Sequence, residues 1–256
     1  MPDVYNCEVV KIEIFNDIAY AITVLGGRLA KDARPGQFLH VKCGESLMLR
    51  RPFGICRIVD NAITFVFEVK GNGTRWLSQV KPGDTLDILG PLGNGFDFPK
   101  GNIIVVGGGF GSPPMLYAAQ SAKSGVTAVL GFRDSSRVIL VKEFEDVCDN
   151  VYLTTDDGSQ GICGSVAAPL EELLKKGGFE AVLACGQHAM QYAVAKLCRQ
   201  YRVPCQVSLE ERMGCGIGAC LVCVCGTRKD GVQSMSRVCK DGPVFDAENV
   251  IWEDVF

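Results

Sequence analysis

The stretch Cys215-Gly-Ile-Gly-Ala-Cys220-Leu-Val-Cys223, together with Cys239 further along, is the most specific signal in the chain. Four residues separate its first two cysteines, two separate the next pair, and fifteen precede the last. This is the C-x4-C-x2-C…C spacing of a plant-type [2Fe-2S] site, in which four thiolates hold two irons. Gly216 and Gly218 suit such a loop, because glycine adopts positive φ and lets backbone N–H groups approach the sulfides.

Two other uses of these cysteines compete with a cluster. Zinc sites usually pair two C-x2-C knuckles, and the chain has one, at Cys220 and Cys223. Disulfides are typical of secreted chains, whereas residues 1–6 lack the basic and apolar regions of a signal peptide. The spacing therefore predicts a [2Fe-2S] cluster held by four cysteines: Cys215, Cys220, Cys223 and Cys239.

The overall composition limits the classes of protein that the chain fits. Its 256 residues are expected to form two or three domains. A net charge of −3 does not favour nucleic acid or an anionic membrane surface as a partner. No uncharged apolar run reaches the length of about 18 residues that a membrane span needs. Thirteen cysteines without a signal peptide indicate a reducing compartment, so we expect a cytoplasmic protein that binds neither nucleic acid nor membrane.

Residues 1–99 show the period-two pattern of an antiparallel barrel or sandwich. Short β-rich runs such as 37–42, 53–59 and 62–69 are separated by turn signals, among them Lys81-Pro-Gly-Asp84.

Two motifs in this region fit the binding of a dinucleotide. Arg50-Arg51-Pro52-Phe53 places guanidinium groups, which bind diphosphate well, beside an aromatic ring. Gly71-Asn-Gly73-Thr74 leads into a short helix that we expect Thr74 to cap, and a helix start is an anion site. Taken singly, each motif is more often a surface turn or a tight loop.

Together and in this order, the two motifs resemble the flavin-binding barrel of the ferredoxin–NADP reductase superfamily. There an Arg-Pro-aromatic-Ser strand cradles FAD, and a Gly-Thr helix start holds its pyrophosphate. The resemblance implies FAD as a cofactor and nine contact residues: Arg51, Pro52, Phe53, Gly54, Val66, Phe67, Glu68, Gly73 and Thr74. The chain departs from the superfamily at Gly54, where Ser is usual, so a hydroxyl contact near the reactive edge of the flavin is missing.

Residues 100–205 alternate strands with helices, which predicts a doubly wound parallel sheet. The β-branched run 102–106 enters Gly107-Gly-Gly-Phe-Gly-Ser112 and then a helix, which is the order of a phosphate-binding loop. The match to G-x-G-x-x-G is imperfect, because Ser112 stands at its sixth position, and a tight structural turn fits nearly as well. A later strand ends at Cys185-Gly186, on the same edge of the sheet.

This segment resembles the pyridine-nucleotide domain of the same superfamily, whose glycine turn takes the NAD(P) pyrophosphate and whose Cys-Gly element lies beside the nicotinamide. The resemblance implies six contact residues: Gly107, Gly108, Gly109, Gly111, Cys185 and Gly186. Gln187 stands where the superfamily has Pro, and Cys185 fits a small buried core residue as well.

The sequence leaves the choice between NADH and NADPH open. Arg133, Ser135 and Arg137 suit a 2′-phosphate, whereas Asp134 opposes one. We favour NADH.

Residues 206–256 are too few to fold around a core of their own, so we expect the cluster to be part of the fold of a small C-terminal domain. Cys205 and Cys225 are extra thiols that we expect to be buried. The two histidines, His40 and His188, adjoin no serine or cysteine in a nucleophile pattern. We therefore predict that both are structural and that no residue acts as a catalytic acid or base.

The order of barrel, nucleotide domain and cluster, with Ser208-Leu-Glu-Glu-Arg-Met-Gly-Cys215, resembles the family of electron-transfer subunits of B-type, NAD-dependent dihydroorotate dehydrogenases over nearly the whole chain. Related reductases tend to have Asp at the first ligand position, where this chain has Cys215. The resemblance implies a catalytic FMN-containing partner subunit in a heterotetramer. It also implies electron flow from dihydroorotate through the cluster and FAD to NAD+, in pyrimidine biosynthesis.

Two alternatives stay open. The chain also fits a diaphorase subunit of another oxidoreductase, of the ferredoxin–NADP, sulfide dehydrogenase or hydrogenase type, and it fits a flavin-free iron–sulfur electron carrier. Plant-type clusters lie near about −400 mV, which is low for accepting electrons from an organic substrate. We therefore predict that N–H donors from residues 216–218 raise the potential of this cluster.

Overall fold

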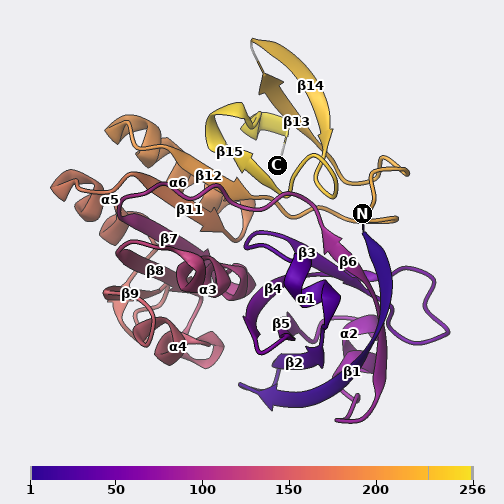
Figure 1. Cartoon of the computed structure of the whole chain (residues 1–256). Helices are drawn as coiled ribbons and strands as arrows, with labels where there is room; N and C mark the ends of the chain where they lie inside the picture. The colour runs from indigo at the N-terminus through magenta and orange to yellow at the C-terminus, as the bar shows by residue number, and fades with distance from the viewer. Residues whose placement is uncertain (1, 230, 255–256) are drawn as a thin grey trace.

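The computed structural model describes residues 2–229 and 231–254. Three regions follow one another along the chain: a closed antiparallel barrel, a mostly parallel sheet with helices on both faces, and a C-terminal region with a β-hairpin (Figure 1). The predicted fold class is therefore confirmed.

The barrel consists of six strands in the order β1-β2-β5-β4-β3-β6. Its interior is filled by branched and aromatic side chains such as Phe65, Ile55 and Ile88, which have no exposed surface. The bounds of its elements are β1 Asp3–Ile14, β2 Ala19–Leu25, α1 Arg28–Asp32, β3 Phe38–Val41, β4 Arg51–Val59, β5 Ala62–Glu68, α2 Asn72–Leu77 and β6 Thr85–Leu92.

Strand β3 contributes side chains both to the barrel core and to a core outside the barrel. Leu39 and Val41 belong to the barrel core, whereas Phe38 belongs to the core that also contains the cysteines of the C-terminal region. Because side chains alternate along a strand, His40 shares the outward face with Phe38.

The second region is a seven-stranded sheet in the order β10-β9-β8-β7-β11-β12-β15, in which only β15 runs antiparallel to its neighbour. Its strands are β7 Ile103–Gly108, β8 Val126–Phe132, β9 Asn150–Thr155, β10 Ile162–Cys163, β11 Ala181–Cys185, β12 Cys205–Ser208 and β15 Val244–Asp246. The connecting helices are η1 Gly109–Gly111, α3 Ser112–Ser121, η2 Ser135–Arg137, α4 Val141–Glu145, α5 Ala167–Lys176 and α6 His188–Tyr201.

The helices cover the two faces of this sheet in pairs. Met115 and Leu116 of α3 and Phe144 of α4 pack in one apolar core, and Leu170 of α5 and Val194 of α6 pack in the other. The sheet is thus doubly wound, with its strand ends free to line a site beside the barrel.

The C-terminal region is tied to the sheet at both ends. After the cysteine loop come β13 Val224–Lys229 and β14 Val232–Arg237, which form a hairpin, and then β15, η3 Ala247–Asn249 and η4 Trp252–Asp254. The boundary expected between residues 205 and 206 falls inside β12, and β15 pairs with that same strand. The division into 1–99, 100–205 and 206–256 stays a prediction.

Among the residues that the structure describes, no helix has the length and apolar character needed to cross a bilayer.

Candidate cofactor sites

A cavity of about 290 Å³ lies between the barrel and the edge of the sheet. Its wall joins residues of the predicted flavin strand to residues of the predicted nicotinamide site. The predicted residues in it are Pro52, Phe53, Gly54, Val66, Phe67, Glu68 and Cys185. The cavity therefore brings residues of the two predicted sites to one place.

Strands β4 and β5 form most of the barrel side of the cavity. Phe53 stacks on Phe65 of the neighbouring strand, with ring centroids 5.1 Å apart and an interplanar angle of 16°. One face of the Phe53 ring therefore packs against Phe65 inside the barrel. Pro52 and Gly54, which flank it, point to the other side of the strand.

Gly54 occupies a place where a side chain has little room. A Cβ at this position would lie 3.2 Å from Pro114 of helix α3. Because glycine stands here in place of the superfamily's serine, α3 can approach β4 closely. This contact joins the barrel to the doubly wound sheet.

The two arginines of the barrel motif have different environments. Arg50 donates to the Asp87 carboxylate at 2.8 Å and to the Asp87 carbonyl at 3.0 Å, so it is used within the barrel. Arg51 instead lies over the start of α2, where a Cβ added to Gly73 would be 3.0 Å from its Nε atom. Arg51 and the free N–H groups of this helix turn together suit a phosphate.

Thr74 is not the cap of α2, contrary to the prediction. The helix begins at Asn72 with Gly71 in the N-cap position, so Thr74 lies in the third helical position. Its hydroxyl accepts hydrogen bonds from the N–H groups of Gly71 at 3.2 Å and Lys70 at 2.9 Å. Thr74 therefore holds the backbone of Lys70 and Gly71, which leads into the helix.

The glycine turn after β7 packs directly on the Cys-Gly element. A Cβ at Gly111 would overlap the Cys185 carbonyl, and one at Gly108 would overlap the Met190 sulfur. Gln191 of α6 donates to the Gly186 carbonyl at 2.7 Å. The two predicted elements of the nucleotide site are thus in contact, although the glycines themselves lie outside the cavity wall.

Cys185, Glu210 and Glu211 are titratable groups on the sheet side of the cavity. Burial raises the pKa of the Cys185 thiol strongly, so the thiol is neutral at physiological pH. Desolvation by the surrounding protein raises the pKa of the Glu210 carboxyl although the residue is exposed, while the charges of His188 and Lys70 act in the opposite direction. Sequence analysis did not assign Glu210 or Gln191 to the site, because only the tertiary fold brings them there.

The cysteine loop turns its backbone N–H groups toward sulfur. Cys215 Sγ accepts from Ile217 at 3.4 Å, Ala219 at 3.3 Å and Cys220 at 3.4 Å. Gly218 N–H donates to Cys239 Sγ at 3.1 Å.

The other two sulfurs are bonded in the same way. Cys239 N–H donates to Cys223 Sγ, and Cys215 N–H donates to Cys220 Sγ, both at 3.4 Å. All four predicted ligands thus accept an amide hydrogen bond, as thiolates of an iron–sulfur site do.

The cysteine loop shifts the pKa values of Cys215 and Cys239 in opposite directions. Burial opposes ionisation of Cys215, but the hydrogen bonds from Ile217, Cys220 and Ala219 outweigh it and lower its pKa to about 6. Burial and the bond to Cys223 raise the pKa of Cys239 to about 12. Within residues 2–229 and 231–254, no group of three or more His, Cys, Asp or Glu side chains is arranged to hold a single metal ion.

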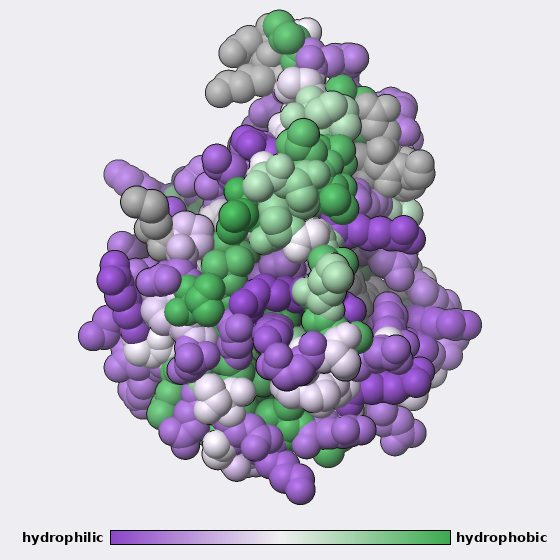
Figure 2. Space-filling model, turned by 90° about the vertical axis from the view of Figure 1, so that its right-hand side faces the viewer, coloured by the Kyte–Doolittle hydropathy of each residue, from purple (hydrophilic) through white to green (hydrophobic). Residues whose placement is uncertain are grey.

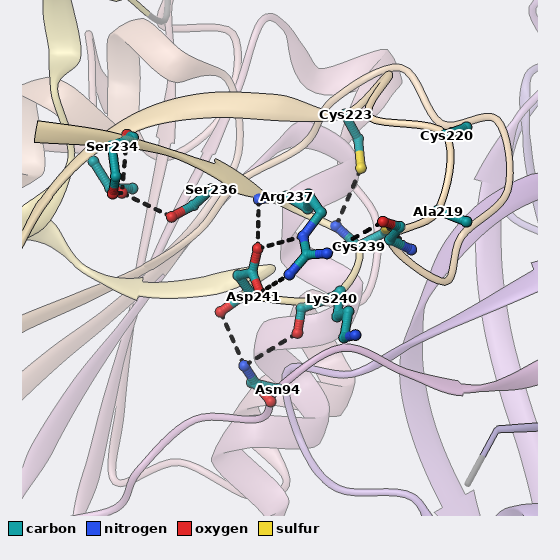
Figure 3. A network of polar contacts seen from close by, with 12 residues as sticks. Asn94, Ala219, Cys220, Cys223, Ser234, Ser236, Arg237, Cys239, Lys240 and Asp241 are labelled. Atoms are coloured by element: carbon teal, nitrogen blue, oxygen red, sulfur yellow. Dashed lines mark hydrogen bonds and ion pairs between the residues drawn. The ribbon is translucent and has the colours of Figure 1, made fainter.

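Arg237 connects the turn that carries Cys239 to Gly218 in the cysteine loop (Figure 3). Its guanidinium donates to both carboxylate oxygens of Asp241 at 2.8 Å and to the Gly218 carbonyl at 3.3 Å. Asn94, which follows β6, donates to the Asp241 carbonyl at 2.9 Å. This network fixes the turn that carries Cys239 against the barrel, and no local sequence pattern indicated it.

The two extra thiols, Cys205 and Cys225, are buried as predicted. His188 is bonded through Nε2 to the Glu210 carbonyl at 2.9 Å. His40 is fully buried beside the cysteine loop.

Comparison with known proteins gives concordant matches. The family described as the iron-sulfur cluster binding domain of dihydroorotate dehydrogenase B matches residues 210–251. The chain is 42% identical to the dihydroorotate dehydrogenase B (NAD(+)) electron transfer subunit of Caldanaerobacter subterraneus subsp. tengcongensis, over 87% of this chain and 89% of that protein. It is 36% identical to the subunit of the same name from Desulforamulus reducens, over 99% of this chain and all of that protein.

Solved structures agree with the fold. A chain of an NADH-dependent reduced ferredoxin-NADP oxidoreductase superposes with a TM-score of 0.88 at 31% identity, covering 98% of this chain and 91% of that one. The ferredoxin reductase of carbazole 1,9a-dioxygenase superposes with a TM-score of 0.65 at 18% identity, covering 79% of this chain and 67% of that one.

Proposed function

The chain belongs to the family of electron transfer subunits of NAD(+)-dependent dihydroorotate dehydrogenase B, and we propose that it passes electrons between a catalytic FMN-containing dihydroorotate dehydrogenase subunit and NAD+ in pyrimidine biosynthesis. The observation that carries the proposal is the placement of two sites. The cavity is lined by Phe38 of β3 and by residues 52–54 of β4, and the loop with four amide-bonded cysteines meets the same strand β3 at His40.

FAD is the group that fits the barrel side of the cavity. When bound, it exchanges electron pairs with NAD and single electrons with a [2Fe-2S] cluster. Pro52, Gly54, Val66, Phe67 and Glu68 would line the ring system, with Phe53 behind it. Arg51, with the turn at Gly73 and Thr74, would hold the pyrophosphate.

NAD would enter from the sheet side. The turn of Gly107, Gly108, Gly109 and Gly111 is packed tightly enough on Cys185 and Gly186 to place a nicotinamide against the flavin. Since Cys185 is a neutral buried thiol, its role is to shape this wall rather than to donate a proton.

The charges around Arg137 favour NAD over NADP. Its guanidinium lies 3.3 Å from Glu68 and 3.9 Å from Asp134, so two carboxylates already neutralise this cation. A 2′-phosphate would have to compete with them.

The cysteine loop would hold the [2Fe-2S] cluster through Cys215, Cys220, Cys223 and Cys239. The N–H groups of Ile217, Gly218, Ala219 and Cys220 stabilise added negative charge on the sulfurs. We therefore expect a potential above the plant-type value of about −400 mV.

The partner subunit would dock where the cluster nears the surface. Ile217, Leu221 and Val222 of the loop are exposed, and Met48 of the loop before β4 is 96% exposed. Figure 2 shows a hydrophobic band over the face that lies on the right of Figure 1. An apolar surface beside a redox site suits a permanent partner in a hetero-oligomer such as a heterotetramer.

The thiol chemistry fits the cytoplasm. All thirteen cysteines are free, which is expected in a reducing compartment.

A second candidate is a diaphorase subunit of another oxidoreductase. The superposition on a chain of the NADH-dependent reduced ferredoxin-NADP oxidoreductase favours it, since the fold serves that enzyme too. A flavin-free iron–sulfur carrier has less support, because a cavity lies beside Gly54.

Anaerobic purification of the tagged chain from its own cells tests the assignment. We expect a dihydroorotate dehydrogenase subunit with FMN to co-purify, and orotate to form from dihydroorotate with NAD+. Co-purification of a larger flavin or iron–sulfur subunit instead would assign the chain to the second candidate.

A further inference from the structure

His40 lies between the flavin strand and the cysteine loop. On the outward face of the barrel it stands next to Phe38 on β3 and directly opposite Pro52 on β4. Phe38 and Pro52 both line the cavity. On its other side the His40 ring meets the loop, since a Cβ added to Gly216 would lie 2.6 Å from Nδ1.

The His40 ring is buried without being satisfied. Its exposed fraction is 0%, and neither ring nitrogen has a hydrogen-bond partner. Native structures keep few buried polar groups unpaired, so each one needs an explanation. A leucine would fill the same space with no unpaired nitrogen, which indicates that a nitrogen is needed.

The nearest polar groups indicate what that nitrogen serves. Burial lowers the pKa of the His40 ring to about 4, so the ring is neutral, while the backbones of Arg50 and Cys215 act to raise it and therefore lie near the ring. Neither backbone forms a hydrogen bond with a ring nitrogen. Arg50 precedes the flavin strand, and Cys215 is the first ligand of the predicted cluster. The His40 ring thus lies between the backbone of Arg50, beside the flavin strand, and the backbone of Cys215, in the cysteine loop.

We propose that His40 is a positioning residue that ties the cluster loop to the flavin strand, by donating a ring N–H to the backbone carbonyl of Cys215 when the loop closes on its cluster. The inference rests on the proposed function, because it needs a cluster at Cys215. It assigns to His40 a role in holding the two redox sites at a fixed distance, which is what rapid electron transfer between them requires.

Two substitutions of His40 separate the hydrogen bond from the packing. His40→Leu fills the space without a donor, whereas His40→Gln keeps an N–H at similar reach. The full chain is purified anaerobically and reconstituted with iron and sulfide, and the reduced cluster is followed by its EPR spectrum and by iron release to a chelator. We expect His40→Leu to alter the spectrum and to release iron about tenfold faster, as loss of an outer-shell partner does, and His40→Gln to stay close to the unaltered chain.

A glycine pair tests the same contact without changing His40. Gly216 and Gly218 have φ of 73° and 81°, so an alanine strains the backbone similarly at both. At Gly216 the added Cβ meets the His40 ring, whereas at Gly218 it lies 2.6 Å from Cδ of the flexible Lys240 side chain. We expect Gly216→Ala to release iron several-fold faster than Gly218→Ala, even if His40→Leu fails to fold.

The outcomes are distinguishable. Equal spectra and iron release in His40→Leu and the unaltered chain would overturn the proposal, and so would equal damage in the leucine and glutamine variants, because packing alone would then explain it. Gly216→Ala no worse than Gly218→Ala would also count against it. An unaltered chain that shows no [2Fe-2S] spectrum after reconstitution would overturn the proposed function together with this inference.

Discussion

The wall of the cavity comes from segments spread between Gly36 and Pro243, whereas three of the four cysteines of the cluster loop lie within residues 215–223. The cavity is shaped by strands whose side chains pack in large apolar cores, and these cores hold its walls in place. The cluster loop is shaped by N–H groups that turn toward sulfur, and two of its cysteines, Cys223 and Cys239, are part of the apolar core below it. A site of the first kind is expected to survive the loss of its ligand, and a site of the second kind is expected to depend on it.

The largest effect expected from this difference comes from removing a cluster ligand. Cys239→Ala should abolish the cluster and loosen the C-terminal region, while the barrel keeps its FAD. Iron, sulfide and flavin content of the purified protein measure both. Cys225→Ala is the matched control, because Cys225 is as buried as Cys239 but lies outside the four-cysteine spacing. Loss of flavin together with iron would show that the two sites are not independent.

An intermediate effect is expected at the flavin strand. Arg51→Ala removes a charged contact to phosphate worth about 1.5–3 kcal/mol, which weakens FAD binding roughly ten- to hundredfold. Arg50→Ala breaks the pair with Asp87 instead, so it should lower the melting temperature with little change in FAD affinity. Titration of the flavin-free protein with FAD distinguishes them. Equal FAD affinity in the two variants would remove the assignment of Arg51.

The smallest effect expected is a shift of potential at the cluster. Arg237→Gln removes a cation that holds the Gly218 carbonyl, so the midpoint potential should fall by about 30–60 mV, where ~59 mV is a tenfold bias. Asp241→Asn removes the negative partner of that cation and should raise the potential. EPR-monitored redox titration measures the sign of each shift. Shifts of the same sign in both variants would mean that loop geometry dominates over charge.

The same difference explains how far sequence could predict the structure. The four cysteines lie in a local pattern that fixes their chemistry, and the loop brings all four to amide donors. The period-two pattern of residues 1–99 predicted a barrel or sandwich, and the alternation of strands with helices in residues 100–205 predicted the parallel sheet. Local patterns such as these depend on near neighbours in the chain.

The rest depends on contacts between distant segments. Thr74 was expected to cap α2, but Gly71 takes that position and the helix begins two residues before the threonine. Glu210, Gln191 and Arg237 reach their sites only through the packing of α6, the segment after β12 and the hairpin. The return of β15 to the sheet could not be predicted either, because nothing near residues 244–246 marks β12 as their partner.

Anaerobic titration of the purified chain with NADH, followed by flavin absorbance and by EPR, tests the central claim most directly. The account predicts that the flavin bleaches and that the spectrum of a reduced [2Fe-2S] cluster then appears in the same protein, with no other subunit present. Bleaching of the flavin with a cluster that stays oxidised, or a chain that binds iron but takes up no FAD, would contradict it.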